Sequence, residues 1–357
     1  MKTYIKFLIH LFNRSLLKVF LTFFIIILII NVLEQIEFFK NVDLNFFYLL
    51  FLSFLNTPSI LFEILPFIFL ISAQVFFIYL IDNKELEIFK YMGLNNLNII
   101  KIISVYTFIT SLLIVIIFYN FSAILENSYL SIKNKYSEDN KYLAVITGNG
   151  LWIKDEIGNN INIIHANKTE NEFLLDVSIT QFNKDFEIQS IINSKKVDIS
   201  SFQWKLFEPL ILKNNQSIVI NKMTLQSNFN LKKINSLFSN LSSLTLFELF
   251  KLRKSYKSLN YSVIDVDSHL YKVISYPVYL TLITIFAAII MFNIRYQKNS
   301  LFKIVLGIFL SVIIYYINYF LNILGTNEKI PLVLSIFMPL IILTIINFIS
   351  IIKLNEK

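Results

Sequence analysis

The chain contains long, uninterrupted apolar stretches, and their length constrains the fold more than any other feature. A helix needs about 20 apolar residues to cross the roughly 30 Å hydrocarbon core of a bilayer. Only 16% of the residues are charged and the mean hydropathy is +0.63, so one soluble core does not account for the composition. We predict an α-helical membrane protein with six transmembrane helices: Leu16–Leu33, Pro58–Ile81, Asn98–Phe121, Lys272–Phe292, Leu301–Leu324 and Pro331–Ile352.

The first two spans have flanking segments that need separate interpretation. Basic residues precede the apolar run Val19–Leu33, as in a signal peptide, but no small-residue cleavage site follows it. We therefore expect an uncleaved first span. The amphipathic stretch Leu44–Leu55 precedes the second span and is expected to lie in the membrane interface.

The segment between the third and fourth spans has a different composition, with mixed charge and short alternating runs. Short strands at this spacing, separated by turn residues such as Asn183-Lys184-Asp185 and Asp155–Asn159, predict an inserted all-β, jelly-roll-like domain. After Leu231 the pattern becomes helical, and Thr245 with Glu248 forms a capping-box pattern before Leu249–Tyr256. The expected strands are Tyr142–Thr147, Leu151–Lys154, Asn162–His165, Leu174–Phe182, Phe186–Val197, Trp204–Pro209 and Ser217–Ile220.

These patterns divide the chain into a 3+3 arrangement of spans around the insertion. Residues 1–121 hold the first three helices, 122–271 form the β domain with a helical return, and 272–357 hold the last three helices. Both tryptophans, Trp152 and Trp204, fall in the β domain, where they are either core anchors or part of a lipid-facing groove; we expect them in the interior.

Basic residues in short loops predict the orientation, because Lys and Arg accumulate on the cytoplasmic side. Both termini and the loop after the fourth span are basic, whereas the loops at the other membrane face are mixed or acidic. The prediction is that both termini are cytoplasmic and that the β domain is periplasmic. The basic set is Lys2, Lys6, Arg14, Arg295, Lys298, Lys353 and Lys357, and the opposite set is Glu34, Glu37, Lys40, Asp43, Glu328 and Lys329.

Several kinds of chemistry are excluded or disfavoured. The net charge of +8 lies mostly beside apolar runs, which argues against nucleic-acid binding. With no cysteine, disulfides, Cys-based zinc sites and a Cys nucleophile are impossible. The three histidines lack metal-ligand spacing, and the six glycines form no phosphate-binding loop. We expect no catalytic residue, no metal and no cofactor bound by this chain, and ATP hydrolysis, if used, by a separate subunit.

The predicted cytoplasmic loop between the second and third spans, residues 82–93, reads as a short charged helix. Its apolar residues Leu86, Phe89 and Tyr91/Met92 fall near helical spacing, and Gly93 suits the C′ position that ends a helix. Such an element is suited to transmit the motion of a soluble partner into the bilayer. A solvated connector is the competing interpretation. The candidate coupling residues are Glu85, Leu86, Glu87, Phe89, Lys90 and Gly93.

Three stretches resemble a known family. Leu65-Pro66 with Glu85-Leu86 and Gly93 is similar to the "LP…SELVVMRAAG" stretch of the YjgP/YjgQ permeases, the LptF and LptG subunits of the lipopolysaccharide exporter. The stretch Gly150, Leu151, Trp152, Ile153, Lys154, Asp155 closely resembles the "GLWAKDG" motif of the LptG branch, and Lys272 through Pro277 to Arg295 resembles the motif of the fourth span. The resemblance runs in order along the whole chain.

The resemblance implies a permease subunit of an ABC transporter in the bacterial inner membrane. Family members pair as LptF–LptG heterodimers, bind two copies of an LptB-like ATPase, which uses ATP and Mg²⁺, and pass lipopolysaccharide to an LptC/LptA-like periplasmic bridge. By position, Glu85 matches the glutamate that contacts the ATPase.

One departure concerns lipid recognition. The family's first span ends in basic residues that meet lipid phosphates, whereas this chain has Glu34, Glu37 and Lys40 there. These three are the candidate lipid contacts, and the departure puts the phosphate contacts in doubt.

Other functions stay open at this point. The chain could be the LptF-type partner, or a non-transporting scaffold or sensor whose β domain binds an extracytoplasmic ligand. A lipid-modifying enzyme would need a polar catalytic cluster near the interface, and the sequence shows none. A lipoprotein-release permease places its large domain after the first span, unlike this chain.

Overall fold

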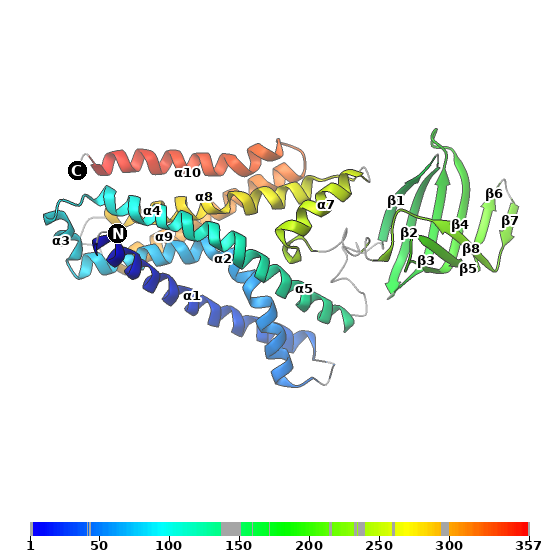
Figure 1. Ribbon diagram of the computed structural model, residues 1–357, viewed down its shortest axis with the longest axis horizontal. Helices are drawn as coiled ribbons and strands as arrows, with labels where there is room; N and C mark the ends of the chain where they lie inside the picture. Colours follow the sequence, from blue (N-terminus) through cyan, green and yellow to red (C-terminus); the bar gives the residue numbers. More distant parts are fainter. Residues whose placement is uncertain are drawn as a thin grey trace. The chain divides into compact units, whose positions relative to one another are not determined.

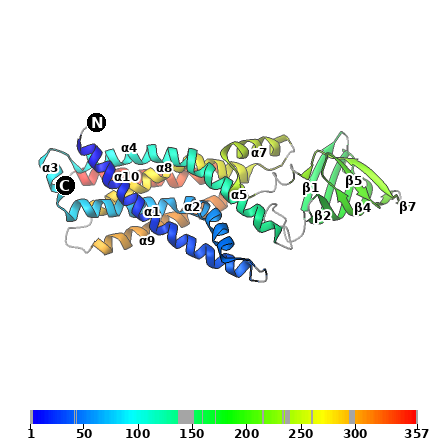
Figure 2. The same cartoon turned by 60° about the horizontal axis from the view of Figure 1, so that its bottom comes forward.

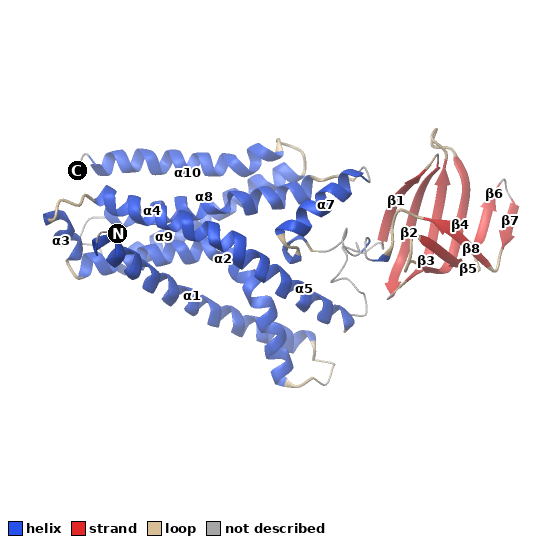
Figure 3. Ribbon diagram, viewed as in Figure 1, coloured by secondary structure: helices blue, strands red, loops and turns tan. Residues whose placement is uncertain are grey.

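The computed structural model divides the chain into two compact units, each described here by itself. The helical unit comprises Met1–Glu126 and Ile264–Lys357, and the β unit comprises Asn127–Val263. Figure 3 shows the separation of helix and strand along the chain. The insertion predicted from composition, 122–271, contains the β unit. The structure describes residues 3–40, 42, 44–136, 151–158, 160–170, 172–213, 216–231, 234, 240–258, 261–293 and 300–355.

Six helical segments in the described residues are long and apolar enough to span a membrane, which confirms the predicted number. The third of these segments is continuous through α4, a π-helical stretch η1 and α5. Figures 1 and 2 both place the N- and C-terminal ends at the α3 end of the helical unit. The elements are α1 Thr3–Phe38, α2 Phe46–Asp82, α3 Glu85–Tyr91, α4 Asn96–Leu113, η1 Ile114–Tyr119, α5 Asn120–Lys135, α8 Ile264–Asn293, α9 Ser300–Thr326 and α10 Leu332–Asn355.

The first two spanning helices exceed the length that a bilayer requires. With 36 and 37 residues, α1 and α2 are nearly twice the roughly 20 residues that cross the hydrocarbon core, so they tilt, bend or project beyond it. Most of the stretch Leu44–Leu55 forms the first turns of α2, which begins at Phe46, and its expected position in the membrane interface stays a prediction. Figure 1 shows α2 bent along its length, and Pro58 and Pro66 lie inside it, where each removes a backbone donor.

Packing inside the helical unit is uneven. The most apolar windows of α2 and α8 are 61% and 67% buried, so these helices form its core. The corresponding windows of α1 and α9 are only 17% and 11% buried. α9 approaches its neighbours at glycines: a Cβ on Gly307 would lie 2.1 Å from the Gln74 amide on α2, and one on Gly325 would lie 2.1 Å from the Ser335 hydroxyl on α10. Small residues allow this approach.

A buried polar contact fixes α1 to α2 within the apolar surroundings. The side-chain amide of Asn31 donates to the Thr57 hydroxyl at 3.1 Å, and the amide of Asn56 donates to the Asn31 carbonyl oxygen at 3.1 Å. In hydrocarbon such groups have no water to bind, so a mutual hydrogen bond favours one register of the two helices.

The strands of the β unit form one antiparallel sheet in the order β1-β2-β3-β4-β5-β8, with β6 pairing β4 and β7 pairing β6. The predicted antiparallel β domain is therefore confirmed, although β6 and β8 had no clear sequence signal. The region predicted as the strand Tyr142–Thr147 lies outside the described residues. The bounds are β1 Leu151–Ile157, β2 Asn160–Glu170, β3 Phe173–Phe182, β4 Ile188–Asp198, β5 Gln203–Phe207, β6 Leu210–Lys213, β7 Gln216–Val219 and β8 Lys222–Gln226.

Alternating burial along the strands produces an apolar inner face. In β1, Leu151 and Ile153 are buried while Trp152 is 55% exposed between them. The expectation of an interior Trp152 was wrong, because the two-residue period of the strand places it opposite Leu151 and Ile153. Trp204 on β5 is fully buried, as expected, and its indole N–H donates to the Phe229 carbonyl at 2.7 Å.

A buried carboxylate connects the two ends of the strand order. Asp155, at 1% exposure, lies on β1 and accepts hydrogen bonds from the segment that follows β8. The donors are the Ser227 hydroxyl at 2.7 Å, the Asn228 backbone N–H at 3.1 Å and the Asn228 side-chain amide at 2.8 Å. The predicted turn within Asp155–Asn159 is present at Gly158, which has φ +62°, but β1 continues three residues beyond the expected end at Lys154, to Ile157.

The return towards the helical unit begins with α7, Leu246–Ser258. The predicted capping box is confirmed: the Glu248 carboxylate accepts from the Thr245 N–H at 2.9 Å, and the Thr245 hydroxyl accepts from the Glu248 N–H at 3.4 Å. Beyond α7, the Tyr261 hydroxyl accepts from the Lys154 N–H at 3.1 Å and donates to the Lys154 carbonyl at 3.2 Å. Burial raises the pKa of Tyr261 to about 12.

The hydrogen bonds of Asp155 lead to a prediction about the stability of the β unit. Asp155→Asn replaces an accepting oxygen by a donor that faces other donors, so we expect the free energy of unfolding to fall by about 3 kcal/mol. Because both tryptophans lie in this unit, tryptophan fluorescence during denaturation of the full chain reports on it. Glu156→Gln is the control: its ion pair with Lys154 is partly exposed, and we expect a loss below about 1 kcal/mol. If both variants lost the same free energy of unfolding, the hydrogen bonds of Asp155 would not be what holds β1 to the segment after β8.

Candidate functional site

The short helix α3 connects α2 to α4 and contains the predicted coupling residues. It begins after Lys84, whose φ of 56° is left-handed, and is preceded by Asn83, which caps α2. At its end the Leu94 N–H donates to the Phe89 carbonyl and the Gly93 N–H donates to the Lys90 carbonyl, both at 2.9 Å. With φ +81° at Gly93, this is a Schellman ending, and the predicted C′ position of Gly93 is confirmed.

One face of α3 packs against the spanning helices and the other is open. Leu86 and Phe89 are buried, and the Phe89 ring lies 6.1 Å from that of Phe7 on α1. The expected extension of this face to Tyr91/Met92 was wrong, because both are mostly exposed, at 89% and 70%. α3 ends at Tyr91, so Met92 already lies beyond the helix, in the turn that Gly93 closes. The exposed surface comprises Glu87, Ile88, Lys90, Tyr91 and Met92.

Glu85 lies at the boundary between the packed and open faces of α3. Its Oε2 atom is buried and has no hydrogen-bond partner among the described residues. Partial burial raises the pKa of this carboxyl above its usual value. A carboxylate oxygen without a donor is costly to keep out of water, which accounts for the direction of this pKa shift.

The predicted lipid contacts lie at the other end of α1. Glu34 and Glu37 are exposed in its last turns, and Lys40 is exposed just beyond its end at Phe38. The three do not converge with α3, which lies at the opposite end of the helical unit (Figure 1). Among the described residues at this position, two carboxylates accompany one lysine, a charge balance that does not favour phosphate.

Two further motifs differ in how fully they are described. Leu151 and Asp155 face the inner side of the sheet, while Trp152 and Lys154 face the other side, where the Trp152 ring packs 4.2 Å from that of His165. Gly150 lies outside the described residues. In the fourth-span motif, Pro277 is buried inside α8, and Arg295 also lies outside the described residues.

A polar cluster that sequence reasoning missed joins three helices at the end of the spans away from α3. On one side, the Ser59 hydroxyl of α2 donates to the buried carboxylate of Glu126 on α5 at 2.6 Å. Glu63, one turn after Ser59, interacts electrostatically with Glu126 and with Lys272 on α8. Polar and charged groups within spanning helices are rare and commonly mark functional positions.

The other side of this cluster holds α8 against its neighbours. The Tyr119 hydroxyl of η1 is hydrogen-bonded to Nε2 of His269 at 2.9 Å, so the histidine is satisfied, as expected from its isolated position. The Tyr276 hydroxyl donates to the Phe62 carbonyl of α2. Helical spacing did contain a signal: Tyr119 and Glu126 are seven residues apart, as are His269 and Tyr276, so each pair shares a helix face.

Metal chemistry gains no support from the described residues, which include no group of three or more His, Asp or Glu side chains able to hold an ion. The cluster instead pairs hydroxyl, imidazole and carboxylate groups across helices. We therefore assign it to helix positioning.

The packing of α3 generates a prediction. Phe89→Ala removes the main buried ring of this helix, at a cost of about 3 kcal/mol, so α3 should undock from the spans more often. Trypsin cleavage after Lys84 and Lys90 should then accelerate by about tenfold or more in the purified full chain. Ile88→Ala, on the exposed face of the same helix, should leave the cleavage rate unchanged. Equal acceleration would show that Phe89 does not anchor α3.

Comparison with known proteins identifies the family to which this chain belongs. A search of curated proteins finds no match. The family model described as "Lipopolysaccharide export system permease LptF/LptG" matches residues 6–353, which is nearly the whole chain and includes all six spans and the inserted sheet. The chain therefore belongs to the LptF/LptG permease family of the lipopolysaccharide export system, and it is a multi-pass inner-membrane protein.

Proposed function

We propose that this chain is the LptG-type permease subunit of an ABC exporter, which extracts lipopolysaccharide from the inner membrane and passes it to a periplasmic bridge. Family membership and the absence of a phosphate-binding loop in the sequence support a permease driven by a separate ATPase. The stretch Gly150–Asp155 supports the LptG type over the LptF type. ATP and Mg²⁺ then belong to the ATPase, and this chain binds no cofactor of its own.

The observation that carries the proposal is the construction of α3. It is fixed to the spans by Leu86 and Phe89, so a force applied to α3 reaches α1 and α2 directly. Its open face presents Ile88, Tyr91 and Met92, which are large side chains suited to a groove on a soluble partner. The Glu85 carboxylate, partly exposed at the edge of this face, would accept a hydrogen bond from a basic residue of that partner.

A second permease subunit is proposed on the basis of the two least buried spans. α1 and α9 present mostly apolar, exposed faces, although each is long enough to span the bilayer. Their exposure suits a heterodimer in which these helices line the lipid path between subunits. Lipopolysaccharide would then meet Glu34, Glu37 and Lys40 at the end of α1, with the partner subunit adding the basic phosphate contacts.

The orientation that this function requires places α3 and both termini in the cytoplasm and the β unit in the periplasm. The basic termini support it, since Lys and Arg favour the cytoplasmic side. The chain enters and leaves the β unit at the ends of the third and fourth spans that lie away from α3. The sheet would then receive the lipid and pass it to an LptC/LptA-like bridge.

Thiol labelling tests the orientation, because the chain has no cysteine of its own. Single cysteines replace Glu87 on α3 and Glu156 on β1, both of which are exposed. A membrane-impermeant reagent added to cells with a permeabilised outer membrane should label the cysteine at 156 and not that at 87. Inverted inner-membrane vesicles should reverse the pattern. Labelling of both positions from the same side would contradict the proposal.

Charge reversal tests the coupling role of Glu85. Glu85→Arg replaces the acceptor by a like charge facing a basic partner, so ATPase binding should weaken by about tenfold to a hundredfold, as expected for a charge-assisted bond. Co-purification of the ATPase and cell growth measure the effect. Glu85→Gln should retain part of the ATPase binding that Glu85→Arg loses.

The control for this reversal lies at the opposite end of the helical unit. Glu328→Arg makes the same charge change in the exposed connection between α9 and α10, and it should leave ATPase binding intact. Unchanged binding in Glu85→Arg would show that α3 does not couple through this carboxylate, and it would favour a scaffold or sensor without an ATPase.

A further inference from the structure

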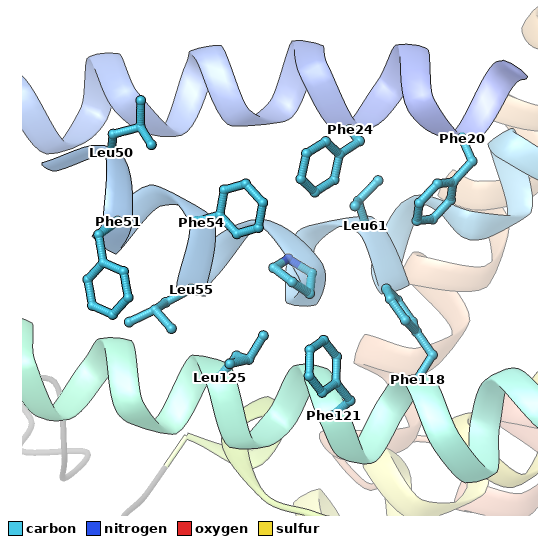
Figure 4. Close-up of a pocket in the computed structure, with 11 residues that line it drawn as sticks. Phe20, Phe24, Leu50, Phe51, Phe54, Leu55, Leu61, Phe118, Phe121 and Leu125 are labelled. Carbon is cyan, nitrogen blue, oxygen red and sulfur yellow. The ribbon is translucent and has the colours of Figure 1, made fainter. Parts of the chain in front are cut away.

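The helical unit contains an apolar pocket that neither the family assignment nor the proposed function uses. It has a volume of about 510 Å³ and lies between α1, α2 and the η1–α5 segment (Figure 4). Its lining is entirely apolar and rich in phenylalanine, including Phe24 on α1, Phe54 on α2 and Phe121 on α5. The volume falls within the range of about 300–1,000 Å³ that is usual for ligand sites.

The walls of the pocket are fixed by aromatic contacts between helices. The rings of Phe24 and Phe54 meet edge-to-face at 5.4 Å, and those of Phe20 and Phe118 meet edge-to-face at 6.2 Å. Such pairs add to packing beyond the area they bury. Phe118 belongs to η1, where the π-helical winding shifts side chains relative to an α-helix. The pocket is therefore formed by the way the three helices pack against one another.

The position of the pocket determines which molecules reach it. Its lining comes from the middle of α1 and from those halves of α2 and of the α4–α5 span that lie away from α3. Phe51, Phe54 and Phe121 are each about half exposed, and Ile117 and Ile124 beside them are exposed on the surface of the same span. The pocket is thus continuous with the hydrocarbon-facing surface, and its occupant comes from the bilayer.

We propose that the pocket holds one acyl chain of an ordinary phospholipid from the leaflet away from α3. No polar side chain lines it, so no head group is recognised and occupancy follows lipid concentration. Phospholipid is the bulk bilayer lipid, and a chain buried here gains packing contacts from the phenylalanine walls. The bound chain braces α1 against α5. This inference does not depend on the lipid that the protein transports.

Photo-crosslinking tests the site in the unmodified full chain. The protein is reconstituted in phosphatidylethanolamine and phosphatidylglycerol vesicles with a trace of phosphatidylcholine that carries a diazirine at the end of one acyl chain. After irradiation and digestion, crosslinks should concentrate severalfold in residues 50–61 and 118–125 over the exposed face of α9. A uniform distribution over all lipid-facing helices would overturn the proposal, since it would indicate only annular contact.

Pocket-filling variants provide an independent measurement. Leu125→Trp places a large ring in the pocket, whereas Ile124→Trp places the same ring on the adjacent exposed face. Phospholipid retained through purification, measured by native mass spectrometry, should fall about tenfold in Leu125→Trp and stay at the unmodified level in Ile124→Trp. No retained phospholipid in the unmodified chain, or equal loss in both variants, would overturn the proposal.

The source of the acyl chain is distinguished by competition. Lipopolysaccharide added to the vesicles should leave crosslinking to 50–61 and 118–125 unchanged if the site belongs to phospholipid. Loss of these crosslinks would overturn the phospholipid assignment and assign the pocket to the transported lipid. The Glu85→Arg experiment is independent of either result.

Discussion

The requirement that a helix satisfy its own backbone hydrogen bonds inside hydrocarbon is the constraint on which the rest of this structure depends. It produces six helices with apolar surfaces, and it leaves side-chain polar groups as the means of specifying how the helices meet. The contact of Asn31 with Thr57 and that of Ser59 with Glu126 are examples. With α2 and α8 as the buried core, the unit can leave α1 and α9 open to lipid or to another subunit without losing its own packing.

The features that sequence could predict are those encoded locally. Span number followed from apolar length, the end of α3 followed from Gly93, and the start of α7 followed from Thr245 and Glu248. The family stretch around Asp155 was visible as a motif, but its structural role was not, because its partners Ser227 and Asn228 lie more than seventy residues later. The functional roles of Glu85 and of the α1 end stay predictions.

The features that sequence could not predict depend on how segments converge. No residue pattern marks η1, because the π-helical stretch has the same apolar composition as the α-helix around it. The pocket and the polar cluster lie on either side of this region, with Phe118 in one and its neighbour Tyr119 in the other. Trp152 was misplaced because a strand exposes alternate residues, and the face of a single residue depends on a register that only the paired sheet defines.

The Tyr261 hydroxyl affects whether a further strand can pair with the open edge of β1. β1 pairs with β2 on one side only, so its other side would ordinarily offer backbone donors and acceptors to any incoming strand. At Lys154 the backbone N–H and C=O are both already hydrogen-bonded to the Tyr261 hydroxyl, in place of the two backbone bonds that a neighbouring strand would make. A strand that paired with β1 at this point would first have to displace that ring. The phenol of the returning segment therefore occupies, at Lys154, the backbone groups through which a further strand would pair with β1.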